Sequence, residues 1–382
     1  MRPVRDASGR PNRSTHYQRA FTPRSTPGIH ASTASAVPPW RNSSYTPPGV
    51  RELYTTVQEE AEEPRREAAL VVDVSPRGPY SLALSARGAG DACRRFRGGV
   101  LTASVEGEGG LEIVRARQRP DGTVSLSASS ELGLERLRFE LGLDDDHSEF
   151  LQRFSDDPLL GATLRAFRGL RPVRLATVAH ALLRALCGQL ITAREARSIE
   201  ARVIRRTSPR DLVSGLYAPP SQERLAALAP AELCRLGLAP TRAATLIRLC
   251  RTLDLERLRE LPSSSVFARL ARERTIGPWS IGVIFLEGLG RYDHGLVADL
   301  GLVKLYSVLA GRWVSEAEMG ELIAHYGEWE GLASVYLLRG SRQGLVPLGR
   351  GAVDVATGAR ALRLRREQPL ALRPKRGIDS AR

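Results

Sequence analysis

The sequence predicts an α+β protein in which a small antiparallel β-sheet with helical cover precedes an all-α domain. Alternating or β-branched runs, separated by Gly- and Pro-rich turns, extend from Ala68 to about Leu143, as is typical of antiparallel sheets. From Asp157 onward, apolar residues recur at helical spacing and strand patterns are missing. We therefore expect a sheet domain at 67–148 and a helical domain at 149–340.

Both ends of the chain are predicted to be basic tails. Residues 1–66 are rich in Ser, Thr, Pro and Arg and poor in aliphatic residues. Such a composition buries too little apolar surface to offset the entropy of ordering, so we expect disorder. An over-extended start site or an arm that attracts DNA are the two explanations left open. Residues 341–382 lose their periodicity and end in a basic run, a solvated tail or a non-specific phosphate contact.

The charge of the 382-residue chain is unevenly distributed. Its net charge is +14, of which residues 1–50 carry +6 and residues 363–382 carry +5, leaving +3 for residues 51–362. A basic chain suits a nucleic-acid partner, although the tails hold most of the excess. No apolar run approaches the roughly 20 residues that span a bilayer, and no secretory signal is visible. We expect a soluble, cytoplasmic protein.

Cysteine spacing gives no sign of a metal centre. The four cysteines are Cys93, Cys187, Cys234 and Cys250, and no two have the two-residue spacing of a zinc or iron–sulfur site. We expect reduced thiols that are buried or idle, and no metal. Lysine is nearly missing: only Lys304 and Lys375 occur among 56 basic residues.

Several elements of each domain can be placed. Strands are expected at 70–74, 80–86, 99–106, 111–117 and 123–128, with a helix at 132–143. Helical segments are expected at 158–170, 177–189, 223–229, 231–235, 241–253 and 265–272. Capping boxes at Thr192–Glu195 and Ser315–Glu318 begin two more helices. The sheet domain carries no catalytic constellation and is expected to be a scaffold.

The stretch from Ala271 to Leu305 organises the helical domain. It predicts a helix end, a tight hairpin at 275–277, a helix beginning at Pro278, a glycine-rich loop, and an acid at the start of a third helix. Glycine at 277 would permit backbone conformations that a side chain forbids, and proline suits a first helical turn. Free N–H groups at such a helix start favour an anion such as a nucleic-acid phosphate.

Three motifs in this order resemble the helix–hairpin–helix DNA glycosylase superfamily, specifically its 3-methyladenine DNA glycosylase II branch. They are CGQLIT at 187–192, IGPWS at 276–280 and VADLGL at 297–302. The resemblance covers about residues 68–340 and includes GPYSLAL at 78–84 and LGLDDD at 141–146. It implies an N-terminal antiparallel α/β domain, a helix–hairpin–helix glycosylase domain, and removal of damaged bases from DNA.

Asp299 is the catalytic residue that the resemblance implies. Base removal passes through an oxocarbenium-like state, and a nearby carboxylate would stabilise its positive charge or orient the attacking water. Aspartate is also a preferred helix N-cap, and one residue can serve both roles. Many relatives have a second acid immediately before this one, whereas this chain has Ala298.

Trp279, Val283 and Leu338 match positions that line the base pocket in the branch. Relatives that also cut the strand carry a lysine at the position of Trp279, where it forms a Schiff base, and tryptophan cannot do so. Val283 and Leu338 replace aromatic residues of the branch, which weakens stacking on a cationic base. Tyr292, His294, Trp329 and Tyr336 are candidates to furnish the site instead.

DNA contacts are implied at two further places. Gln189 and Leu190 match the wedge that fills the gap left by a flipped nucleotide. Thr275, Ile276, Gly277 and Ser280 match the hairpin that holds the DNA backbone. Thr275 replaces the first glycine of that hairpin, and a β-branched residue disfavours positive φ, so the hairpin is expected to be reshaped.

The sequence thus predicts a monofunctional DNA glycosylase that acts on damaged, alkylated bases in duplex DNA. The alternatives are a lesion-binding protein that has lost efficient catalysis and a glycosylase/lyase that uses Lys304. We expect no cofactor, apart from a monovalent cation at the hairpin that the sequence leaves open. We also expect no membrane contact and no obligate protein partner.

Overall fold

The computed structural model describes residues 69–189 and 191–347, all within one compact unit, Pro64–Arg382. The sheet is antiparallel throughout, with the strand order β1-β5-β4-β3-β2. Its strands are β1 (Leu70–Val74), β2 (Arg94–Arg97), β3 (Val100–Gly107), β4 (Gly110–Gln118) and β5 (Val124–Ala128). This confirms the small antiparallel sheet that the alternating pattern predicts.

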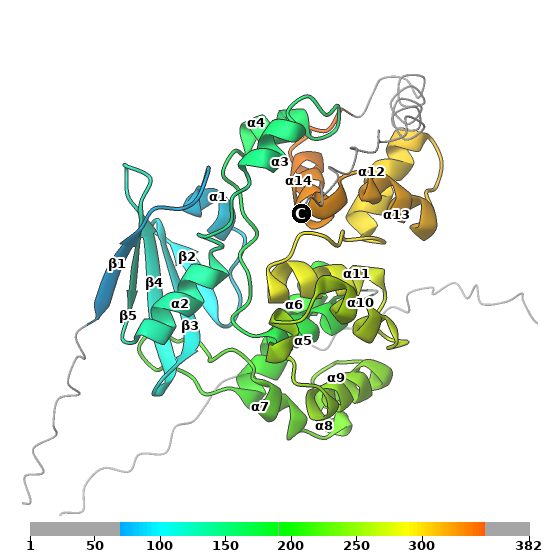
Figure 1. Ribbon diagram of the computed structural model, residues 1–382. Coiled ribbons are helices and arrows are strands. Elements are labelled where there is room, and N and C mark those ends of the chain that lie inside the picture. Colours follow the sequence, from blue (N-terminus) through cyan, green and yellow to red (C-terminus); the bar gives the residue numbers. More distant parts are fainter. Residues whose placement is uncertain (1–68, 190, 348–382) are drawn as a thin grey trace, which may run out of the picture. The chain divides into compact units, whose positions relative to one another are not determined.

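One face of the sheet is covered by α2 (Glu131–Glu140), which Figure 1 shows lying across the strands. Alternation in β5 is regular: Val124, Leu126 and Ala128 are buried, while the two serines between them are partly exposed. The Ser130 hydroxyl accepts a hydrogen bond from the Gly133 N–H and caps α2. The sheet core therefore lies between the even-numbered residues of β5 and α2.

The strand predicted at 80–86 is wrong, because α1 (Leu82–Ala86) is a short helix. Leu82, Leu84 and Ala86 alternate as in a strand, but Leu82 and Ala86 also have the i, i+4 spacing of one helix face, and both are buried. Ser81 decides between the two, since its hydroxyl accepts from the Leu84 N–H and caps a helix.

Strand β2 was not predicted. Its sequence, RRFR, has no apolar alternation, and it lies at the edge of the sheet with a single neighbour, β3. Charged residues are common on edge strands because they discourage pairing with other chains. Its hydrophobic signal is correspondingly weak.

The rest of the described chain is helical. Its α-helices are α3 (Ser148–Arg153), α4 (Gly161–Ala166), α5 (Val178–Gly188), α6 (Ala193–Thr207), α7 (Gln222–Ala226), α8 (Pro230–Arg235), α9 (Pro240–Thr252), α10 (Ser263–Ala271), α11 (Pro278–Val283), α12 (Leu300–Ala310), α13 (Glu316–Ala324) and α14 (Glu330–Arg342). Shorter 3₁₀ turns are η1 (Glu256–Arg259) and η3 (Gly327–Trp329). Both predicted capping boxes are confirmed, at Thr192–Glu195 and Ser315–Glu318.

Five helical elements, α5, α11, η2 (Ile284–Leu289), α12 and α14, position the candidate site. Helix α11 continues directly into η2, a π-helix, which ends at Gly290 with φ = 69°. Both α11 and η2 pack on α5, and α12 packs on α14. Figure 1 shows α5, α10 and α11 grouped together, with α12 and α14 close to each other.

The predicted tails fall outside the described residues, except for residues 341–347. Helix α14 ends at Arg342, two residues beyond the boundary expected at 340. Among the described helices, none combines the length and apolarity needed to cross a membrane.

Candidate functional site

Gln189 ties the end of α5 to the hairpin. It is the C-cap of α5, and its Nε2 donates hydrogen bonds to the Thr275 carbonyl at 2.7 Å and to Ser280 Oγ at 2.8 Å. The predicted wedge residue thus holds the hairpin against α5 in this structure. Leu190, the second wedge candidate, lies outside the described residues.

The hairpin does not need its glycine. Gly277 has φ = −85° and ψ = 176°, extended backbone that any residue adopts, and open space surrounds the position of a Cβ. The prediction that a side chain would be forbidden there is wrong. Thr275 has no positive φ either, and its Oγ1 lies 2.7 Å from Thr245 Oγ1 on α9. The threonine therefore brings no backbone strain to the hairpin.

Burial limits which hairpin groups can meet a ligand. Ile276 is 4% exposed and Ser280 is 2% exposed, so both side chains face the core, while Gly277 and Pro278 are exposed. The Gly277 N–H makes no hydrogen bond with the described residues. Any anion at this turn would meet backbone N–H groups, because the side chains at 276 and 280 point inward.

Glu273, just before the hairpin, anchors it to two helices. Its carboxylate accepts hydrogen bonds from Arg248 on α9 and from Arg269 on α10. The hydrogen bond from Arg248, supported by that from Arg269, lowers the pKa of Glu273 to about 2. The hairpin is therefore held by α5, α9 and α10.

Asp299 uses its two carboxylate oxygens for different partners. Oδ1 accepts from the Gly301 N–H at 2.8 Å and the Leu302 N–H at 3.3 Å, which makes Asp299 the N-cap of α12. Oδ2 accepts from the Trp279 indole Nε1 at 3.0 Å, and Asp299 is partly exposed. The cap fixes the carboxylate, and one oxygen stays available beside the indole.

Trp279 lies against the end of α5, where a glycine makes room for it. A Cβ added at Gly188 would come within 2.4 Å of Trp279 Cη2. Trp279 is thus held at one end by Asp299 and packed at the other against the Gly188 backbone. Gly188 was not predicted as a site residue, although it stands next to Gln189 inside the CGQLIT motif.

The other two predicted pocket residues lie differently. Val283 is 5% exposed and belongs to the hydrophobic core of the helical part. Leu338 on α14 is partly exposed, and its Cδ2 would contact a Cβ at Gly301, beside the Asp299 cap. Of the pair, Leu338 is the one that borders the Asp299 region.

Ala298 has a left-handed backbone. Its φ of 65° makes it the one non-glycine residue with positive φ in 69–189 and 191–347. Such a conformation costs an L-residue roughly 1–2 kcal/mol. It immediately precedes Asp299, and strained backbone is often found beside functional groups. Nothing in the sequence signals it, because alanine is not enriched in this region of φ.

The aromatic residues proposed to refurnish the site have other partners. The Tyr292 hydroxyl donates to Asp145 Oδ2, and its ring stacks on Trp329. Tyr336 is buried and donates to the carbonyls of Phe167 and Leu170. The His294 ring packs on Phe285 and Phe267. Within the described part of the chain, none of the four forms a hydrogen bond or ring contact with Asp299 or Trp279.

A second polar cluster is buried where the sheet part meets α5 and α6. Arg184 on α5 donates to Asp91, to Glu200 on α6 and to Glu287 in η2. His180 Nε2 lies 2.7 Å from Glu200 Oε1. Asp91, His180 and Glu200 have their ligand atoms close enough for a metal. However, the Arg184 guanidinium already bridges the carboxylates of Asp91 and Glu200, so this is a structural ion network.

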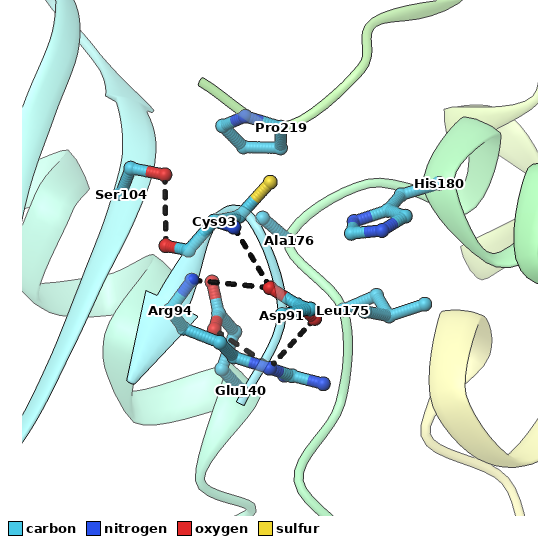
Figure 2. Close-up of a pocket in the computed structure, with 9 residues that line it drawn as sticks. All are labelled: Asp91, Cys93, Arg94, Ser104, Glu140, Leu175, Ala176, His180 and Pro219. Carbon is cyan, nitrogen blue, oxygen red and sulfur yellow. Dashed lines mark hydrogen bonds and ion pairs between the residues drawn. The ribbon is translucent and has the colours of Figure 1, made fainter. Parts of the chain in front are cut away.

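Beside this network is a cavity of about 10 Å³, on the order of one water molecule. Figure 2 shows Asp91 at its centre, accepting hydrogen bonds from the backbone of Cys93 and Arg94, with Glu140 below. The cavity has no room for a base or a nucleotide. All four cysteines are unpaired, as predicted.

Lys304 is exposed on α12 and makes no hydrogen bond or ion pair with the described residues. At the hairpin, the carbonyls of Glu273 and Thr275 each accept one hydrogen bond, from the Ile276 N–H and from Gln189 Nε2, and each keeps a second lone pair. The cation stays a prediction.

A curated glycosylase is similar to this sequence. No family model matches the chain. It is similar to the DNA-3-methyladenine glycosylase of Bacillus subtilis (strain 168), with 26% identity over 206 residues that cover 52% of this chain and 68% of the relative.

Solved structures with a similar fold come from two kinds of glycosylase. The 3-methyladenine DNA-glycosylase from Archaeoglobus fulgidus has a TM-score of 0.60 and 20% identity over 72% of this chain and 98% of its own. The Clostridium acetobutylicum 8-oxoguanine glycosylase/lyase, in complex with dsDNA containing cytosine opposite to 8-oxoG, has a TM-score of 0.59 and 16% identity over 72% and 99%. These likenesses show that the chain has the fold of the two solved DNA glycosylases, with Trp279 and Asp299 joined by a hydrogen bond.

Proposed function

We propose that this protein is a monofunctional DNA glycosylase that removes damaged, alkylated bases from duplex DNA in base-excision repair. The observation that carries the proposal is the 3.0 Å hydrogen bond from Trp279 Nε1 to Asp299 Oδ2. It places a fixed carboxylate beside an aromatic ring in a chain whose relative is named a DNA-3-methyladenine glycosylase.

Asp299 would act on the developing charge of the sugar. The bond between the anomeric carbon and the base nitrogen breaks, and its electron pair leaves with the base. The carboxylate stabilises the oxocarbenium-like carbon or orients a water, whose oxygen bonds to that carbon as its proton passes to the carboxylate or to solvent. The α12 cap holds the carboxylate in place, so no reorganisation is needed when the charge forms.

Trp279 supports hydrolysis over strand cleavage. A lyase step needs an amine at this position to form a Schiff base, and an indole has none. Lys304 is exposed on α12 and makes no hydrogen bond to Trp279 or Asp299. Because the similar folds include a glycosylase/lyase, the likeness alone leaves this point to experiment.

The hairpin would hold the DNA backbone through its N–H groups. Gly277 and Pro278 are exposed, and the N–H groups at the start of α11 have no partners within the helix. The alternative is a lesion-binding protein without turnover. One sequence feature that suggested it, Thr275 in the hairpin, introduces no positive φ. The other residues that suggested it are Ala298, Val283 and Leu338. They would affect the rate of base release and the range of bases accepted.

The test is release of free base from methylated duplex DNA by the full-length protein. We expect release by the wild type and loss of release, with binding retained, in Asp299→Asn. Tight binding by both proteins without release by either would favour the lesion-binding alternative. A borohydride-trapped complex that Lys304→Ala abolishes would show instead that the enzyme is a lyase.

A further inference from the structure

One face of the sheet is not covered by α2, and we call it the open face. Strand register places its side chains in two rows that cross all five strands. The first row is Val71, Ser127, Arg115, Thr102 and Arg95, and the second is Asp73, Ser125, Arg117, Val100 and Arg97. Each row therefore carries two arginines, one on β4 and one on the edge strand β2.

The four arginines form a compact array of positive charge. Residues two apart on one strand are about 7 Å apart, and β2 and β4 lie about 10 Å apart across β3. All four side chains are exposed. Among the described residues, none accepts a hydrogen bond from them or pairs with them at ion-pair distance. This array alone carries more charge than the +3 net of residues 51–362.

The acids near the open face are already engaged. Asp73 pairs with Arg119 at 2.9 Å. Asp211 accepts a hydrogen bond from the Ser214 N–H, which together with the nearby charge of Arg115 lowers the pKa of Asp211. Asp73 is paired with Arg119 and Asp211 offsets only part of the charge of Arg115, so the array keeps a net positive charge. Since the Debye length at physiological salt is about 8 Å, neighbouring arginines on this face repel each other.

Protection of a sheet edge explains only half of the array. Arg95 and Arg97 lie on β2, an edge strand, where charge discourages unwanted pairing. Arg115 and Arg117 lie on β4, which pairs with β3 on one side and β5 on the other. A central strand has no edge to protect, so those two arginines need another explanation.

The surface is also hollowed around the central arginines. Its lining includes Val71, Val100, Arg115, Arg117, Arg119, Ser125 and Ser127. Ser125 and Ser127 of β5 are small and supply hydroxyl donors beside the arginines. Arginine forks and serine hydroxyls are the groups that hold phosphate oxygens along a nucleic-acid backbone.

The hairpin and the open face lie at opposite ends of α6. Helix α6 begins beside Gln189 and has 15 residues, which span roughly 22 Å. The loop after α6 reaches the sheet, where Ser104 Oγ donates to the Tyr217 carbonyl. A duplex held at the hairpin therefore need not touch the open face.

We propose that the open face binds the phosphodiester backbone of a second nucleic-acid segment. It would do so without reading sequence, through arginines 95, 97, 115 and 117. The site goes beyond the proposed glycosylase activity, because it needs neither Asp299 nor a damaged base. It would keep the protein on DNA while the hairpin samples bases.

The test measures the salt dependence of binding to a long undamaged duplex, with the full-length protein between about 50 and 200 mM salt. Removing two phosphate contacts should reduce the slope of log K against log salt by up to about 2. We expect that loss in the double variant Arg115→Ser, Arg117→Ser. The charge-preserving Arg115→Lys, Arg117→Lys should keep the slope of the wild type.

The matched control removes two other exposed, unpaired arginines, Arg205 on α6 and Arg235 on α8. Their replacement by serine should change the slope less than the change at 115 and 117. Equal slopes for the wild type and the 115/117 serine variant would overturn the proposal. A second outcome would also overturn the proposal: the open face binds polyglutamate, and the serine variant leaves the salt slope of duplex binding unchanged. The partner of the face would then be an acidic protein.

This test is independent of base release. Far-UV circular dichroism shows whether the serine variant folds, and the lysine variant keeps the comparison if it does not. A protein that releases no base can still show the slope change, so failure of the glycosylase proposal and failure of this one are distinguishable.

Discussion

The Trp279 indole donates a hydrogen bond to one oxygen of Asp299, while the other oxygen caps α12. The carboxylate is thereby immobilised from two sides. The capping hydrogen bonds stabilise the start of α12. The hydrogen bond from the indole lies at the candidate base pocket. The two contacts can be separated by substitution, because phenylalanine keeps a ring at 279 and removes only the N–H donor.

Trp279→Phe should lower the rate of base release and leave lesion binding nearly intact. A hydrogen bond to a charged group contributes about 1.5–3 kcal/mol, so we expect a fall in kcat of about 10- to 100-fold. Trp279→Ala should lose binding to the lesion as well. Single-turnover release and binding to lesion and undamaged duplex measure both effects. Equal binding losses on the two duplexes would contradict a pocket role.

Gly188→Ala should displace Trp279. The new Cβ would lie 2.4 Å from Trp279 Cη2, closer than atoms approach, so the ring must move. A shift of about 1 Å near reacting groups can cost about 100-fold in rate. Release of base from methylated duplex measures the loss. Stability should change little, because alanine is a better helix former than glycine by about 0.5–1 kcal/mol.

Gly320→Ala is the matched control for that experiment. Gly320 lies within α13, and the nearest atom to an added Cβ is 3.8 Å away, ordinary contact. The substitution should raise the midpoint of thermal unfolding and leave base release unchanged. If both variants retained full activity, the contact between Trp279 and the end of α5 would be irrelevant to function.

Local signals in the sequence predicted what depends on a few neighbouring residues. The capping boxes at 192–195 and 315–318 and the proline start of α11 are set by side chains within one turn, and all three are found. Strand β2 was not predicted because its sequence is mostly arginine and shows no alternation of apolar residues. The segment 80–86 was assigned wrongly because its apolar spacing fits both the two-residue period of a strand and the i, i+4 spacing of a helix.

The contacts that build the candidate site depend on residues far apart in the chain. Gln189 and Thr275 are separated by 86 residues, and Arg184 and Glu287 by 103. The resemblance identified Trp279 and Asp299, and the structure joins them. The sequence resemblance could not show that Gln189 holds the hairpin or that Gly188 makes room for the indole. Nor could it show that the backbone of Ala298 is left-handed.

Ala298→Gly should stabilise the fold, because glycine adopts positive φ without the cost that alanine bears there. We expect a gain of about 0.5–1 kcal/mol. Ala298→Val should destabilise the protein and reduce base release, since a β-branched residue resists this backbone and would turn Asp299 away. Urea unfolding and base release measure the two effects.

The control is Ala201→Gly, in the interior of α6. There the same replacement should cost about 1 kcal/mol, because the helical φ favours alanine. Opposite signs at positions 298 and 201 are therefore expected. A loss of stability at both positions would mean that the left-handed conformation before Asp299 is not maintained in solution.

Glu140 should make stability fall as pH rises. Burial raises its pKa from 4.5 to about 8, and Arg94, whose NH1 is 3.9 Å from Oε2, lowers it too little to compensate. The folded protein keeps this proton up to about pH 8, while the unfolded chain releases it near 4.5. The stabilisation is complete below pH 4.5 and is lost as pH rises through about 8.

Glu140→Gln should remove this part of the pH dependence, because the amide mimics the protonated acid at every pH. Urea unfolding at a series of pH values gives the free energy for both proteins, and the variant should gain relative to the wild type as pH rises. Glu135→Gln, an exposed change on the same helix, should keep the wild-type profile. If the Glu140 variant followed the wild type through pH 8, the carboxyl would have to be ionised and paired with Arg94 in the folded protein.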